Sequence, residues 1–115
     1  MTASRPAAEL VVDVLDLAGA VAVAGLAWPD PELPAELREL AARARALRLG
    51  EGVERLDRLA QALDVAVAAD PEARREAVRV ALDAFQRLVA WARLMRVELE
   101  LLGAEERSRS GPAEA

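Results

Sequence analysis

The chain has 115 residues, a net charge of −5 and 54% hydrophobic residues, many of them alanine. It contains no Cys, His, Tyr, Asn, Lys or Ile, and all fifteen basic residues are Arg. The lack of imidazole and thiol groups excludes Cys nucleophiles, His acid–base chemistry and soft-metal sites, and it leaves only carboxylates and arginines for catalysis. We therefore expect a non-enzymatic protein that uses no cofactor and binds no metal.

The absence of Cys and the negative net charge also indicate a cellular compartment and limit the possible partners. A chain without Cys has no disulfide framework, which fits a reducing cytoplasm. The negative net charge argues against general binding to nucleic acids or to anionic membranes, because phosphate contacts need a concentrated positive surface. A chain of this length suffices for one domain with a single core. We expect that domain over residues 6–103, followed by a disordered tail over residues 104–115.

The first predicted helix covers residues 7–28 and changes character along its length. Its first half carries Glu9, Asp13 and Asp16 on one polar face, at spacings of four and three. Its second half, residues 17–28, is uncharged and rich in Ala and Gly. A transmembrane helix, a signal peptide and a buried helix with small side chains all remain open for this segment. We favour the buried helix, because the acidic residues interrupt the apolar run that the other two need.

Two shorter helices are predicted in the middle of the chain. A proline-rich connector, residues 29–34, ends the first helix, and a second helix follows over residues 35–49. We expect Gly50-Glu51-Gly52 to reverse the chain, because glycines permit tight turns. A third helix then covers residues 51–69. The second and third helices should form an antiparallel hairpin that turns its Leu and Ala residues inward.

The longest predicted helix covers residues 71–102. Asp70-Pro71 favours a helix start and Gly103 favours a helix end. At 1.5 Å per residue this helix is about 48 Å long. Two apolar stripes run along it: a main stripe of Val78, Leu82, Phe85, Leu88, Val89, Ala92, Met95, Leu99 and Leu102, and a second stripe of Val80, Ala84, Trp91, Leu94 and Leu101.

This arrangement predicts an all-α fold, a compact antiparallel four-helix bundle with a long C-terminal helix. Because that helix exceeds the others in length, part of its apolar surface should lack cover within one chain. We expect a non-catalytic interaction or assembly subunit, either a homo-oligomer or a subunit bound to a protein partner. The predicted interface anchors are Trp91, Leu94, Met95 and Leu101, since aromatic and large apolar residues dominate binding hot spots. Cover of the second stripe by the first helix would weaken this prediction.

Other interpretations of the sequence remain open. An Ala-rich bundle can leave room for an apolar small molecule between its helices, which would make the protein a small-molecule-binding regulator. Five arginines near the predicted reversal suggest a nucleic-acid-binding regulator, although acidic residues are interleaved with them: Arg43, Arg45, Arg48, Arg55 and Arg58. Trp91 is also compatible with a plain core position, and Trp28 is placed to close one end of the core.

Overall fold

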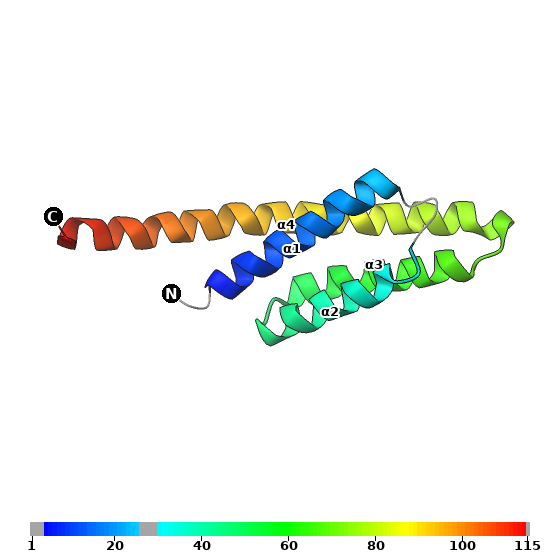
Figure 1. The fold of residues 1–115 in the computed structure, drawn as a ribbon, viewed down its shortest axis with the longest axis horizontal. Helices are drawn as coiled ribbons and strands as arrows, with labels where there is room; N and C mark the ends of the chain where they lie inside the picture. Colours follow the sequence, from blue (N-terminus) through cyan, green and yellow to red (C-terminus); the bar gives the residue numbers. More distant parts are fainter. Residues whose placement is uncertain (1–3, 26–29, 115) are drawn as a thin grey trace.

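The computed structural model describes residues 4–25 and 30–114, with side chains over 5–25 and 30–108, and these residues form four helices. The helices are α1 (Ser4–Ala24), α2 (Leu33–Ala46), α3 (Gly50–Ala68) and α4 (Pro71–Glu114) (Figure 1). No strand occurs in the described ranges. The predicted all-α fold class and the long C-terminal helix are confirmed. Trp28 lies outside the described residues.

The helices pack in a fixed order around one core. α2 and α3 form an antiparallel hairpin, α3 packs against the first half of α4, and α1 crosses the middle of α4 (Figure 1). α1 has far less contact with α2 than with α4. Several of the least exposed side chains lie where these faces meet, among them Leu10, Val11, Val14, Leu37, Leu56, Leu59, Leu63, Leu88 and Ala92. The core therefore lies between the α2–α3 hairpin, α1 and the first two thirds of α4.

α4 determines the length of the molecule. Its 44 residues make a rod of about 66 Å at 1.5 Å per residue, and the principal-axis extents of the chain are 66 × 24 × 18 Å. The radius of gyration is 16.9 Å, against about 13 Å for a globular domain of this length. The C-terminal part of α4 projects beyond the start of α1 and beyond the α2–α3 turn (Figure 1).

The predicted helix end at Gly103 is wrong. Residues 104–114, for which the sequence predicts a disordered tail, continue α4 without a break. A glycine inside a helix costs only about 1 kcal/mol relative to Ala, and the residues that follow it include good helix formers such as Ala104, Glu105 and Arg107. The first helix shows the opposite error, since it ends at Ala24. Gly25 then takes a φ of +85°, and its N–H donates to the carbonyl oxygen of Val21 over 2.7 Å.

The predicted reversal at Gly50-Glu51-Gly52 is also wrong, although the hairpin itself is present. The chain turns earlier, at Leu47 to Leu49, where Arg48 takes the left-handed conformation with a φ of +60°. Gly50 is the first residue of α3, and Gly52 lies buried inside that helix. A Cβ atom at Gly52 would lie 2.5 Å from Cη2 of Trp91. Gly52 thus serves the close approach of α3 to Trp91 rather than the turn.

Candidate interaction site

The four predicted anchors do not share one surface. Trp91 is only 7% exposed, with its indole ring against Gly52 of α3. Met95 is half-buried and packs against the core. Leu94 and Leu101 are 59% and 62% exposed. Trp91 is therefore a core residue of the chain, and Leu94 and Leu101 are surface residues.

Helix geometry explains this division. Successive residues of an α-helix are about 100° apart, so Leu94 lies about 60° from Trp91 on one side and Met95 about 40° from it on the other. Because Trp91 lies at the edge of the core, the 60° rotation to Leu94 points that side chain toward solvent. The 40° rotation in the other direction points Met95 toward the core. Residues of one apolar stripe consequently have different environments.

Several of the exposed apolar residues of α4 form a regular row on the side away from the core, whereas Val80, Leu82 and Leu102 are exposed outside it. Val97, which the sequence analysis did not single out, is 52% exposed and lies between Leu94 and Leu101. Ala90 and Ala104 are exposed in the same row. The spacings between successive members are four, three, four and three, which is the heptad pattern of a helix that packs on a partner helix. We call these five residues the outer seam: Ala90, Leu94, Val97, Leu101 and Ala104.

The signal that identifies Val97 is present in the sequence. Val97 lies three residues after Leu94 and four residues before Leu101, so all three share a face of any helix that contains them. A two-stripe description misses it, because Val97 falls outside both stripes.

Charged side chains border the outer seam. Arg93 and Glu100 precede Leu94 and Leu101 by one residue each, and they form one flank, while Glu98 lies on the opposite flank. Arg96 Nε contacts Glu100 Oε1 at 3.9 Å, whereas Arg93 has no ion pair within the described part of the chain. The seam is thus an apolar row bordered by a cation, Arg93, that the described residues leave without a carboxylate partner.

α1 does not cover the outer seam. Its contact with α4 runs along the neighbouring side, where Leu15, Ala18, Phe85 and Val89 line the α1–α4 groove. Arg93 and the seam residue Val97 also line that groove, and Val97 remains 52% exposed. Nearer the start of α1, Val12 and Leu99 line a second groove between α1 and α4. Of the second predicted stripe, Trp91 is covered by α3.

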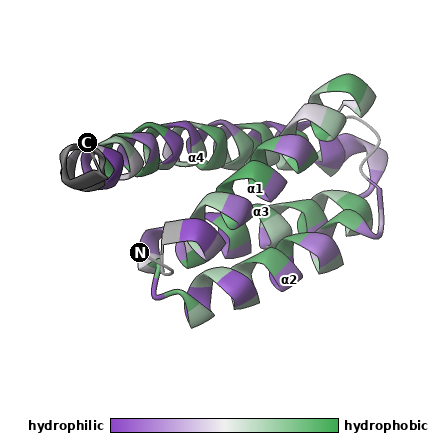
Figure 2. Cartoon of the chain, turned by 60° about the vertical axis from the view of Figure 1, so that its left-hand side comes forward, coloured by the Kyte–Doolittle hydropathy of each residue, from purple (hydrophilic) through white to green (hydrophobic). Residues whose placement is uncertain are grey.

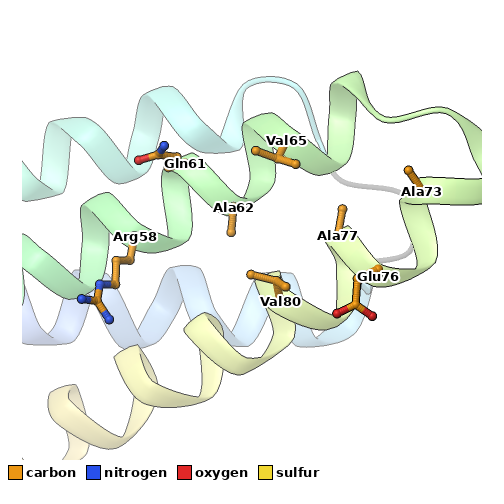
Figure 3. A pocket seen from close by; sticks show the side chains of 8 residues that line it. All are labelled: Arg58, Gln61, Ala62, Val65, Ala73, Glu76, Ala77 and Val80. Atoms are coloured by element: carbon orange, nitrogen blue, oxygen red, sulfur yellow. The ribbon is translucent and has the colours of Figure 1, made fainter.

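A second apolar surface lies between α3 and α4. It is a groove of about 510 Å³ near the link between the two helices (Figure 3). Val65 and Val80 line it and are 55% and 52% exposed. Three polar side chains lie at its borders: Arg58, Gln61 and Glu76. Apolar clefts of this size with a few polar groups are typical of small-molecule sites.

Most members of the arginine cluster are paired with carboxylates. Arg43 contacts Asp13 at 2.8 Å and Arg45 contacts Asp57 at 3.7 Å. Arg55 and Arg58 contact Glu51 and Glu54, four residues before them, at 3.3 and 3.1 Å. These pairs neutralise much of the positive charge that a nucleic acid would need.

Two residues of the carboxylate row on the first helix, Glu9 and Asp13, form surface ion pairs. Asp13 contacts Arg43, and Glu9 contacts Arg5 at 3.5 Å.

Among the residues with described positions, no group of three His, Cys, Asp or Glu side chains is arranged to hold a metal ion. The four helices, as far as they are described, include none with the length and apolar character to span a bilayer.

Comparison with protein-family models, with curated proteins and with solved structures finds no match to this chain. The candidate sites therefore rest on the geometry of the chain itself.

Proposed function

We propose that this chain is a non-catalytic interaction subunit that binds a helix of another protein chain through the outer seam of α4. The observation that carries the proposal is the combination of heptad spacing and exposure at Leu94, Val97 and Leu101. An apolar row with that spacing gains free energy when a second helix covers it, because each side chain then fits between residues of the partner.

The projection of α4 supports the same proposal. Extending a helix beyond the bundle leaves its backbone and side chains with no tertiary contacts, and an isolated helical segment of that kind is marginal in water. A partner helix along the outer seam would bury the apolar row and stabilise the projecting turns together. Figure 2 displays apolar residues recurring along α4 after it leaves the other helices.

Crosslinking in the native cell tests the proposal. We expect a photoactivatable residue in place of Val97 to give a discrete adduct with a protein chain, whether a second copy or a different protein. The same residue in place of Ala42, which is exposed on α2, should give none. Adducts at neither position, or equally at both, would contradict the proposal.

The α3–α4 groove supports a second candidate function, the binding of an apolar small molecule. Its volume and its valine-lined walls suit a hydrocarbon chain or ring (Figure 3). We expect a medium-chain fatty acid to raise the melting temperature of the chain, and Val80→Trp, which fills the groove, to abolish that rise. An equal rise in the wild-type chain and the variant would exclude this groove as the site.

A further inference from the structure

We infer that the partner helix on the outer seam is α4 of a second copy of this chain, packed antiparallel. The inference rests on the proposed function and adds the identity and direction of the partner. It is drawn from the order of large, small and charged residues along the exposed row.

The apolar residues of the seam complement each other when the second helix runs in the opposite direction. Antiparallel helices pair an a position of one chain with a d position of the other. The register that places Leu94 opposite Val97 of the second copy also places Ala90 opposite Leu101. Each of these layers then contains one large and one smaller residue, and Ala104 at the end of the row lies opposite Arg87. A two-fold axis maps the arrangement onto itself, as a closed dimer requires.

The flanking charges select the same register. In it, Arg93 faces Glu100 of the second copy, and the symmetry repeats this pair. The two Cα positions differ by two residues, about 3 Å along the axis, and helical side chains lean toward the N-terminus of their own helix. In an antiparallel pair that lean brings the two side chains together. Arg93, which has no intrachain ion pair in the described residues, thereby gains a carboxylate partner.

The opposite flank opposes this register only weakly. Glu98 approaches its counterpart in the second copy with an axial offset of five residues, about 7.5 Å. The lean of the side chains shortens this offset as well, but the repulsion occurs once and is screened at the surface, so the two attractions outweigh it.

The neighbouring antiparallel registers are unfavourable. A shift of one heptad in one direction sets Arg93 against Arg107 of the second copy and Glu100 against its own counterpart. A shift in the other direction sets Arg93 against its counterpart and moves Arg87 from the end of the apolar row, opposite Ala104, to a position opposite Val97. Each alternative replaces attraction by repulsion between like charges.

A parallel pair is also less favourable. There Arg93 would face Glu98 of the second copy, but Glu100 would face Glu105, so one attraction and one repulsion cancel. The inferred pair also accounts for the projection of α4. Its two-fold axis lies between Met95 and Arg96, near the middle of Pro71–Glu114. The projecting end of each copy would then lie beside the bundle-packed half of the other.

The first test is the molar mass of the purified full chain by light scattering over a wide range of concentration. We expect a monomer–dimer equilibrium that Val97→Glu abolishes while circular dichroism reports unchanged helicity. The control is Val23→Glu, because Val23 is 91% exposed and belongs to α1 rather than to the seam. That variant should associate like the wild type.

The direction and register are tested by exchanging charges. Arg93→Glu and Glu100→Arg each place like charges across the antiparallel pair, and we expect each to weaken the dimer by about tenfold. Mixing the two variants should restore association. In the mixed dimer, the carboxylate introduced at position 93 of one chain faces the guanidinium introduced at position 100 of the other, and the symmetry-related pair is likewise opposite in charge.

Each remaining outcome overturns the inference in a defined way. A parallel dimer would be strengthened by Glu100→Arg, since the new arginine would face Glu105. A wild-type chain that stays monomeric at every concentration would exclude self-association. A crosslinked adduct of a different protein at Val97 would then leave the proposed function standing, whereas the absence of any adduct would remove both.

Discussion

The two faces of α4 have similar composition but different surroundings. On the core face, Ala81, Leu88 and Ala92 are at most 2% exposed, because α1 and α3 cover them. On the outer face, Leu94, Val97 and Leu101 are each more than half exposed. The apolar character of a helical residue therefore predicts burial only when another element lies over it. Substitutions on the two faces of α4, and at contacts elsewhere in the chain, test this contrast.

The largest effect is expected from truncating the core face. Leu88→Ala should lower the free energy of unfolding by about 2 to 5 kcal/mol, because the deletion leaves a cavity between packed helices. The matched outer-face change, Leu94→Ala, should alter it by less than about 0.5 kcal/mol in dilute monomer. Urea titration followed by circular dichroism at low protein concentration measures both. Similar losses for the two variants would mean that the outer face also has cover within one chain.

A smaller effect is expected where α3 meets Trp91. Gly52→Ala adds a Cβ that would lie 2.5 Å from the indole ring, and such overpacking costs about 1 to 3 kcal/mol. The control is Gly19→Ala in α1, where no atom lies within 4 Å of the added Cβ. That change should stabilise the chain by up to about 1 kcal/mol through helix propensity.

The two glycine variants can be compared by thermal melting. Trp91→Phe should relieve the cost of Gly52→Ala, because the smaller ring leaves room for the added methyl group, so a double-mutant cycle isolates the contact. If Gly52→Ala stabilised the chain as much as Gly19→Ala does, the close approach of Trp91 would have no energetic weight.

The smallest effect is expected at the surface link between α1 and α2. Arg43 contacts Asp13 at 2.8 Å, and both side chains are more than 40% exposed. Removing this pair should cost about 0.2 to 1 kcal/mol at low salt, because exposed charges remain hydrated. A double-mutant cycle with Arg43→Ala and Asp13→Ala measures the coupling, which added salt should reduce. A coupling that persisted at high salt would point to a more buried pair.

The fold was largely predictable because helical periodicity is a local signal. Apolar residues at spacings of three and four identify α2, α3 and most of α4 before any contact is known. Asp70 also acts as predicted, since its Oδ1 accepts the N–H of Ala73 over 2.8 Å at the start of α4. In α3, Glu51 contacts Arg55 and Glu54 contacts Arg58 at the spacing of four that favours ion pairs on a helix, so these contacts too follow from local sequence.

The glycines were predicted poorly because one residue type serves several purposes. Gly25 does end a helix, Gly52 admits an aromatic ring, and Gly103 continues a helix. The conformational freedom of glycine is a property of the residue, but whether that freedom is used depends on its neighbours in space.

The sequence alone predicts that the chain is all-α, that its last helix is the longest, and that this helix has more apolar surface than a simple amphipathic helix. Periodicity and residue type suffice for those conclusions, since both act over a few turns. The burial of Trp91 and the exposure of Leu94, Val97 and Leu101 are seen only in the tertiary structure. The physical reason is that burial depends on which helix packs over a residue, and the positions of α1 and α3 around α4 result from packing between residues distant in the sequence.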